Sequence, residues 1–233
     1  MFLSVPYVTS KNNFENYDKL MIVAHPDDET LFGGKMLHDE NGWFVACLTN
    51  VNTVGVDWMN PLYGQDYQDA LDSGKLTRQK EFINAMNHSR TGYLMLGHRD
   101  GDFNNDIGGV KTVRENLRSI IDPRIKKWKK IVTHNAWGDY GHTQHVQTHG
   151  IVKDLASELN IVDGLHCFSF ETNNPNNPNN GPLLNPPKMI EQLVRKFYPS
   201  QIELYEDVWQ KDFFGPLQYA KWQQTIPAVK EKE

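Results

Sequence analysis

The stretch Leu20–Thr30 places an apolar run directly before a histidine and a cluster of acids, and it constrains the fold more than any other part of the chain. Its sequence is LMIVAHPDDET. A short apolar run that ends in a turn signal is typical of a strand buried on both faces, as in parallel sheets. Pro26 cannot donate a hydrogen bond to a neighbouring strand, so we expect the strand to end there. The stretch therefore predicts an α/β fold with polar residues at the carboxyl end of one strand.

Four polar side chains crowd the end of this expected strand: His25, Asp27, Asp28 and Glu29. In open α/β sheets, ligands bind at the carboxyl ends of the strands. Adjacent carboxylates repel one another unless a cation or hydrogen-bond donors hold them, so the cluster predicts a metal ion. The alternative is that acids favour the first turn of a helix. That alternative suits Asp28 and Glu29 but leaves His25 unexplained. We assign a structural role to Glu29.

Apolar segments of strand length alternate with segments of helical spacing over most of the chain, which is typical of βαβ units and a mostly parallel sheet. The sequence therefore predicts one α/β domain over residues 1–233, with a three-layer α/β/α, Rossmann-like fold. Gly33 and Gly34 are expected to let the first helix approach the first strand. The expected strands are 20–23, 43–49, 93–96, 130–133 and 166–171, and the expected helices are 31–38, 76–86, 110–128 with a break at Pro123, and 145–159.

Three segments do not belong to this alternation. Residues 50–76 are rich in Gly, Asp, Asn and Tyr, and we expect a long, functional loop over the strand ends. Residues 171–182 form an Asn/Pro-rich insert without core-forming side chains. Residues 198–233 are rich in aromatic side chains, which we expect to pack against the main domain.

The composition excludes several classes of partner. A net charge of −5 and a pI near 6.0 provide no basic surface for nucleic acid. No apolar run has the length of a membrane span, and the first residues lack the basic region typical of a signal peptide. Cys47 and Cys167 lie far apart in apolar surroundings, so we expect buried thiols rather than a disulfide. This pattern favours a reducing compartment, and we predict a cytoplasmic protein.

Three histidines within eight positions form the second half of the predicted site. His142, His145 and His149 are spaced i, i+3 and i+7, which puts them on one face of a helix. Two histidines and one carboxylate with an open position are typical of catalytic zinc, but also of the iron(II) facial triad. In the iron alternative, His25 and Asp27 would bind the metal with a later histidine. Those oxygenases are usually built on β-barrels, so the alternation of strands and helices favours zinc.

The string AHPDDE at 24–29, followed by H-x-x-H at 142–145, resembles the PIG-L/LmbE-like zinc deacetylases, which remove acetyl groups from N-acetylglucosaminyl compounds. The resemblance covers most of residues 18–171 and includes an R-x-x-E at 78–81 and an Asp-Gly turn at 100–101. It implies one Zn²⁺ per chain. Its expected ligands are His25, Asp28 and His145.

The same resemblance implies the catalytic roles. Asp27 corresponds to the general base, and His142 to the residue that stabilises the oxyanion or protonates the leaving amine. We expect three further residues to contact the substrate: Arg78, Asp100 and Tyr140. For Arg78 and Asp100 the alternative is a salt bridge or a turn cap.

The chain departs from the family pattern in one motif. The family commonly has H-P-D-H where this chain has His142-Thr143-Gln144-His145. An aspartate there can orient an imidazole and raise its basicity, whereas Gln144 can only hydrogen-bond. We therefore expect metal binding to be kept and catalysis to be weaker.

Together these features predict a zinc-dependent hydrolase that removes the acetyl group from an N-acetylated amino sugar or a glycoconjugate. A zinc amidase for a non-acetyl amide is one alternative. A catalytically silent, metal-stabilised sugar-binding protein is another, because of Gln144.

Overall fold

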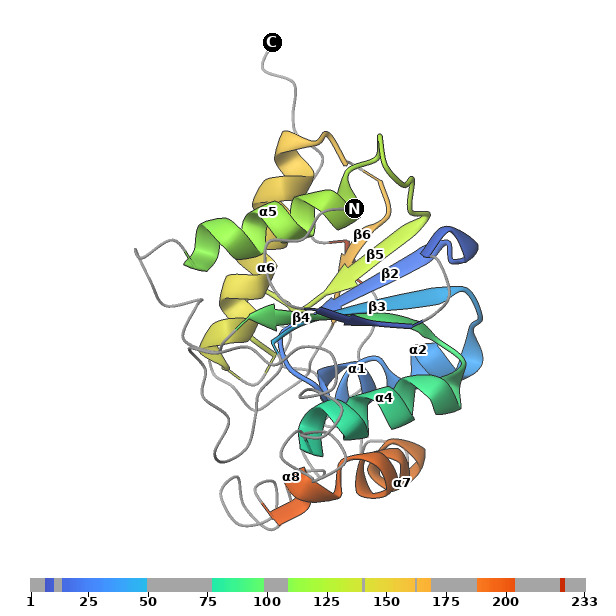
Figure 1. Ribbon diagram of the computed structural model, residues 1–233. Helices are drawn as coiled ribbons and strands as arrows, with labels where there is room; N and C mark the ends of the chain where they lie inside the picture. Colours follow the sequence, from blue (N-terminus) through green and yellow to red (C-terminus); the bar gives the residue numbers. More distant parts are fainter. Residues whose placement is uncertain are drawn as a thin grey trace.

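Seven strands form a single sheet in the computed structural model, which describes residues 7–10, 14–49, 77–98, 109–139, 141–161, 163–168, 188–203 and 223–224. The strands are β1 Tyr7–Thr9, β2 Lys19–Val23, β3 Trp43–Thr49, β4 Gly92–His98, β5 Lys130–Thr133, β6 Leu165–Cys167 and β7 Gln223–Gln224. Their order across the sheet is β1-β4-β3-β2-β5-β6-β7 (Figure 1). The five inner strands are parallel, and β1 and β7 pair antiparallel at the edges.

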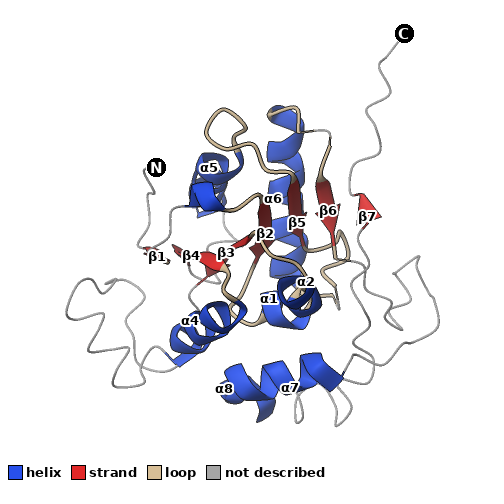
Figure 2. Cartoon of the chain, turned by 90° about the vertical axis from the view of Figure 1, so that its right-hand side faces the viewer, coloured by secondary structure: helices blue, strands red, loops and turns tan. Residues whose placement is uncertain are grey.

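Helices cover both faces of the sheet, which confirms the predicted three-layer α/β/α fold (Figure 2). The helices are α1 Asp28–Leu31, α2 Gly34–Asp39, α4 Thr77–Ser89, α5 Gly109–Ile121, α6 Thr143–Glu158, α7 Lys188–Phe197 and α8 Pro199–Glu203, and a 3₁₀ helix covers Phe14–Asn16. α5 and α6 lie on one face, and α1, α2 and α4 on the other. α7 and α8 lie outside α1, α2 and α4 and add a partial fourth layer.

The central strand β2 is buried on both faces, as its apolar run predicts. Leu20, Met21, Ile22 and Val23 are all 0% exposed. Side chains alternate across a strand, so Met21 and Val23 belong to the core beneath α1, α2, α4 and α7. Leu20 and Ile22 belong to the core beneath α5 and α6. β2 therefore joins the two cores and fixes where its own carboxyl end lies.

The predicted helix 31–38 is two short helices in the structure. α1 begins at Asp28, and the chain bends at Phe32 before α2 begins at Gly34. Gly33 approaches β2 as expected, because an added Cβ would lie 2.4 Å from the Met21 Cε. Gly34 instead approaches α7, where an added Cβ would lie 2.7 Å from the Ile190 Cδ1. The bend therefore lets α1 follow the polar turn directly while α2 packs under the sheet.

Other element boundaries differ from the prediction by a few residues. α5 ends at Ile121, because a residue before proline, here Asp122, disfavours helical backbone. The expected helix to residue 128 is therefore wrong beyond that break. β4 continues through Gly97 to His98, and α6 begins two residues earlier than expected, at Thr143.

Some predictions lie outside the described residues: the loop 50–76, the insert 171–182, most of the aromatic segment 198–233, and both Asp100 and Tyr140. Cys47 and Cys167 are buried free thiols, as expected. Among the described residues, no helix combines the length and the apolar character that crossing a membrane requires.

Candidate metal centre and active site

The candidate site lies at the carboxyl ends of β2 and β5, where the strand order reverses. The chain runs from β2 outward through β3 to β4, and then returns to place β5 on the other side of β2. Such a switch point leaves a crevice in which α/β proteins bind ligands. A hydrogen bond connects the residues that follow β2 and β5: the Ala24 N–H donates to the His134 Nε2 at 2.9 Å. Polar residues that follow β2 and β5 are thereby brought together.

The turn after β2 directs one imidazole and one carboxylate into this crevice. The His25 N–H donates to the Asp28 Oδ2 at 2.8 Å, which closes the turn as α1 begins. Asp27 precedes α1 with φ 132°, a backbone conformation that residues other than glycine rarely adopt. The Arg78 guanidinium on α4 stabilises this turn by contacting the Pro26 carbonyl at 2.6 Å and the Asp27 Oδ2 at 2.9 Å.

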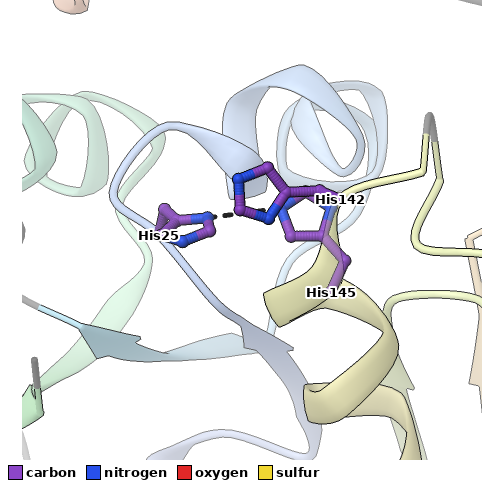
Figure 3. A group of neighbouring side chains, drawn as sticks. All are labelled: His25, His142 and His145. Carbon is purple, nitrogen blue, oxygen red and sulfur yellow. Dashed lines mark hydrogen bonds between the residues drawn. The ribbon is translucent and has the colours of Figure 1, made fainter. Parts of the chain in front are cut away.

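Helix α6 presents two histidines from the other side of the crevice (Figure 3). His142 is the N-cap residue, and its Nδ1 accepts a hydrogen bond from the Gln144 N–H at 3.3 Å. His145 lies within the first turn and is 0% exposed. The ring centroids of His142 and His145 are 4.7 Å apart, and both rings approach His25. The predicted clustering of His25, His142 and His145 is therefore present in the structure.

The three expected metal ligands form a small triangle of donor atoms. The His25 Nδ1 lies 3.2 Å from the His145 Nε2. The Asp28 Oδ2 lies 3.4 Å from the His25 Nδ1, and the Asp28 Oδ1 lies 3.3 Å from the His145 Nε2. Tetrahedral zinc with ligand bonds near 2.0–2.1 Å separates its ligands by about 3.3–3.5 Å. The donor set and its spacing therefore fit a zinc ion, with the two imidazoles facing different oxygens of Asp28.

Hydrogen bonds at the outer nitrogens of the two imidazoles direct their lone pairs toward each other. The His25 Nε2 contacts the Gln144 Oε1 at 2.9 Å, and the His145 Nδ1 contacts the Asp139 Oδ2 at 2.8 Å. Both partners are oxygen acceptors, so each outer nitrogen carries the proton. The His25 Nδ1 and the His145 Nε2 are then the atoms that can bind a metal. This is the outer hydrogen bonding that metal-bound histidines usually have.

Asp139 and His134 also belong to this cluster, and the sequence analysis missed both. Asp139 is 0% exposed, has φ 62°, and receives hydrogen bonds from both the His134 Nδ1 and the His145 Nδ1. Asn135 holds this loop by accepting the Asp139 N–H at 2.9 Å. The detectable signal was the position of His134 immediately after a strand at the switch point. Nothing local predicts that Asp139 reaches His145.

His134 also enters a second group of possible metal ligands. In the described residues, two trios have ligand atoms within 4.8 Å of one another: His25, His142 and His145, and Asp28, His134 and His145. His134 and His142 are the weaker members, because the His134 Nε2 accepts the Ala24 N–H and the His142 Nδ1 accepts the Gln144 N–H. Neither trio is the expected set of His25, Asp28 and His145, which combines members of both and has the spacing of 3.2–3.4 Å described above. That ligand set stays a prediction.

The buried charges show that this cluster attracts positive charge. Burial alone would raise the pKa of Asp28, but the His145 and His134 imidazoles outweigh it and hold that pKa well below its usual range. Burial opposes protonation of His145, yet Asp28 and Asp139 raise its pKa to about 10. Without a metal, the His145 Nε2 that faces Asp28 therefore stays protonated at neutral pH. A metal ion would displace this proton.

His142 has the opposite electrostatic behaviour. Burial, together with the neighbouring His145 and His25, lowers its pKa to about 4. Its ring is half-buried and sits at the amino end of α6, where the helix dipole also disfavours a cation. At neutral pH His142 is therefore a neutral imidazole that accepts through Nδ1 and carries its proton on Nε2.

The remaining predicted residues divide into three groups. Arg78 contacts Pro26 and Asp27, so the salt bridge that we considered as an alternative is present, and its contact with substrate stays a prediction. His149 donates through Nδ1 to the His134 carbonyl at 2.8 Å and belongs to neither trio. Asp100 and Tyr140 lie outside the described residues, so their roles stay predictions.

Glu29 agrees with the structural role expected for it. Its side chain is 0% exposed, and burial raises its pKa to about 7. Its Oε2 accepts the Asp27 N–H at 3.1 Å, while its Oε1 accepts the hydroxyls of Thr30 and Tyr198. Glu29 therefore caps the strained start of α1 instead of facing the crevice.

Comparisons with solved structures agree with this architecture. The structure of a pseudoaglycone deacetylase that acts on an antimicrobial reagent superimposes with a TM-score of 0.52 over 82% of this chain and 85% of its own, at 18% identity. The zinc-inhibited form of teicoplanin deacetylase superimposes with a TM-score of 0.50 over 80% and 86%, at 20% identity. At such low identity, these similarities establish a shared fold.

Sequence comparisons identify the family. An uncharacterised protein of Acanthamoeba polyphaga mimivirus is 34% identical over 79% of this chain and 72% of its own length. The 1D-myo-inositol 2-acetamido-2-deoxy-alpha-D-glucopyranoside deacetylase of Mycobacterium leprae is 24% identical over 65% of this chain, a match that spans only 54% of that enzyme. The family model PIG-L, described as GlcNAc-PI de-N-acetylase, matches residues 20–156, which is more than half of the chain. The chain therefore belongs to the PIG-L family and is a hydrolase of the deacetylase class.

Proposed function

We propose that this protein is a zinc-dependent de-N-acetylase of an N-acetylglucosamine-type sugar or a glycoconjugate that carries one. The observation that carries the proposal is the triangle of His25 Nδ1, Asp28 carboxylate and His145 Nε2, with edges of 3.2–3.4 Å. Family membership supports the acetamido sugar as substrate, and the mycobacterial relative is named for such a substrate. The described histidines and acids offer a donor set that suits zinc.

The contacts of Asp27 favour zinc over the iron alternative. In that alternative Asp27 would bind the metal beside His25. The Asp27 carboxylate instead pairs with Arg78. Asp28 supplies the carboxylate that faces both imidazoles. In the proposed site, Asp28 is therefore the ligand, and the neighbouring Asp27 is available for another role in catalysis.

Asp27 is suited to act as the general base. Bound zinc would lower the pKa of water to about 7 and polarise the amide carbonyl. Asp27 directly precedes the ligand Asp28, and its carboxylate can accept the proton of the attacking water. Arg78 limits the rotation of this carboxylate by holding its Oδ2. The same acid can then return the proton to the departing amine.

His142 is suited to stabilise the oxyanion as a neutral donor. Its Nδ1 accepts the Gln144 N–H, so its proton resides on Nε2. A neutral imidazole at the amino end of a helix can polarise a carbonyl oxygen without giving up its proton. Of the two roles expected for His142, stabilising the oxyanion therefore fits its low pKa better than protonating the amine.

The proposal is tested by two measurements on the same preparation. Elemental analysis should find close to one zinc per chain, and acetate release should follow incubation with N-acetylglucosaminyl compounds, including an inositol conjugate. Chelation should abolish acetate release, and zinc should restore it. Binding of N-acetyl sugars without any acetate release would instead favour the sugar-binding alternative. Release of a different acid from a non-acetyl amide would favour the amidase.

A further inference from the structure

Helices α7 and α8 lie outside the residues that the family model matches, yet they pack directly against the elements that carry the catalytic turn. Both helices lie beneath α1, α2 and α4 (Figures 1 and 2). Ile190 and Val194 of α7 are buried in the same core as Leu31 of α1 and Phe82 of α4. Tyr198 connects the two helices, and its side chain is 0% exposed.

The Tyr198 hydroxyl connects α7 and α8 to the turn after β2. It donates to the Glu29 Oε1, 169 residues away in the chain. The other oxygen of the same carboxylate, Oε2, accepts the Asp27 N–H at 3.1 Å. Tyr198 is therefore two hydrogen bonds away from the backbone of the proposed general base. Among the described residues, the hydroxyls of Thr30 and Tyr198 donate to the Glu29 Oε1.

The backbone of Asp27 needs such support. A φ of 132° is strained in a residue with a Cβ, and the surrounding structure must hold it. Glu29 holds the Asp27 N–H, and Arg78 holds the Asp27 carboxylate and the preceding carbonyl. If either contact is lost, the turn can relax and move the carboxylate away from the crevice.

A second contact connects α8 to the other support. The Ser200 N–H and Oγ both donate to the Glu81 carboxylate, at 2.9 and 2.6 Å. Glu81 lies three residues after Arg78 on α4, so the two side chains share a helix face. The short segment 198–200 thus contacts Glu29, which holds the Asp27 N–H, and the face of α4 that carries Arg78. The Tyr198–Glu29 contact is buried, whereas the Ser200–Glu81 contact is half-buried and has an exposed serine. Apolar packing alone does not explain the Tyr198 contact, since burying a hydroxyl is unfavourable unless it is paired.

We propose that Tyr198 is a positioning residue for Asp27, acting through Glu29, and that α7 and α8 are a necessary support of the active site. The catalytic consequence rests on the proposed function, because it assigns Asp27 as the base. The structural consequence, a weaker hold on the Asp27 N–H, does not depend on any activity.

The test compares Tyr198→Phe with Tyr93→Phe in the full-length protein. Tyr93 is 7% exposed, belongs to the same core, and packs edge-on against Phe82, so its substitution controls for the loss of a buried hydroxyl. Amide hydrogen exchange should accelerate about tenfold or more at Asp27 in Tyr198→Phe, whereas the amides of β2 keep their rates. With an N-acetylglucosaminyl substrate, kcat should fall about tenfold, the loss expected for one hydrogen bond that is made only in the active arrangement. KM and zinc content should stay unchanged.

Glu29→Met is the second variant and also covers a failure of Tyr198→Phe to fold. It keeps the approximate length of the side chain but removes both oxygens, so the Asp27 N–H loses its acceptor and should exchange faster than in the wild type. The proposal is overturned if Asp27 exchanges alike in Tyr198→Phe and Tyr93→Phe, or if both lower kcat equally. A wild-type protein that releases no acetate would contradict the proposed function alone, because the exchange comparison is still informative.

Discussion

The two sides of the crevice are built differently. On the β2 side, His25, Asp27 and Asp28 follow one another in four consecutive positions, and one turn brings all of them to the site. On the α6 side, His145 depends on Asp139, which a separate loop with a left-handed residue brings into contact. The comparison teaches that a continuous motif can supply the ligands and the base. The charge and orientation of the opposite imidazole come from residues that no short motif contains.

The hydrogen-bond partners of the two imidazoles that we propose as metal ligands also differ in charge. The His145 Nδ1 donates to the carboxylate of Asp139, while the His25 Nε2 donates to the neutral amide of Gln144. A carboxylate increases the electron density of the imidazole that it contacts more than an amide does. His145 is therefore expected to be the stronger ligand, and variants on the two sides should differ in their effects.

The largest effect is expected from His145→Ala. This change removes the imidazole that faces both His25 and Asp28, so zinc occupancy should fall to a small fraction of that in the wild type. Elemental analysis after dialysis measures it. His38→Ala, an exposed histidine on α2, is the control and should keep its zinc. Full zinc content in His145→Ala would mean that His134 or His142 completes the set.

On the β2 side, Asp27→Asn should separate catalysis from metal binding. The amide cannot accept a proton, so the rate of deacetylation should fall by a factor of roughly 10² to 10⁴. Zinc content should not change, because the Asp27 carboxylate pairs with Arg78 and Asp28 supplies the carboxylate of the proposed ligand set. Zinc loss in this variant would make Asp27 a ligand and revive the iron-type arrangement.

On the α6 side, His142→Ala should lower kcat by roughly 10² to 10³, the cost of losing one oxyanion donor. His142→Gln should keep more activity, since its amide can still donate. The pH profile distinguishes the two roles of His142, whose pKa is lowered to about 4. A neutral donor loses activity only as the pH falls through about 4, whereas a general acid loses it as the pH rises through about 4. We expect no loss attributable to His142 between pH 6 and 8, and a loss across that range that disappears in His142→Gln would contradict the neutral-donor role.

Asp139→Asn tests the asymmetry between the two imidazoles directly. Replacing the carboxylate that contacts His145 should weaken zinc binding about 10- to 100-fold, the usual effect of changing such an outer partner. Competition with a chelator measures the affinity. Asp154→Asn changes an exposed acid on the same α6 helix and should leave zinc binding as it is. Equal affinities in the two variants would show that Asp139 only shapes the loop.

The smallest effect is expected from Gln144→Glu. The new carboxylate would contact the His25 Nε2 and should strengthen zinc binding by less than about tenfold, which makes the two imidazoles more alike. Chelator competition again provides the measurement. The sequence led us to expect that Gln144 in place of an aspartate weakens catalysis through an imidazole and leaves metal binding unchanged. A changed pH–rate profile with unchanged zinc affinity would restore that expectation.

The sequence predicted those parts of the molecule that depend on local patterns. The bounds of β3 and β5 follow from their apolar runs, and the polar turn after β2 follows from Pro26. The split between α1 and α2 was not foreseen, because it depends on how closely Gly33 approaches Met21. Hydrophobic periodicity contains no information about such a contact.

The site shows the same limit. His25, Asp28 and His145 could be proposed because each belongs to a recognisable string. Gln144 was expected to act on another imidazole, since only the structure shows that its side chain reaches His25. Asp139 could not be predicted, because its contact with His145 depends on a positive φ in the loop before α6. Tyr198 could not be predicted, because its contact with Glu29 joins segments 169 residues apart.

The position of β5 beside β2 has a consequence for how the protein folds during synthesis. The hydrogen bond from Ala24 to His134 spans 110 residues, and the contact between His25 and His145 spans 120. Contacts of such long range form late, after most of the chain has left the ribosome. A nascent chain that ends before residue 130 already contains the whole AHPDDE string but lacks its partner imidazoles. It should therefore leave zinc unbound until the second half of the sheet assembles.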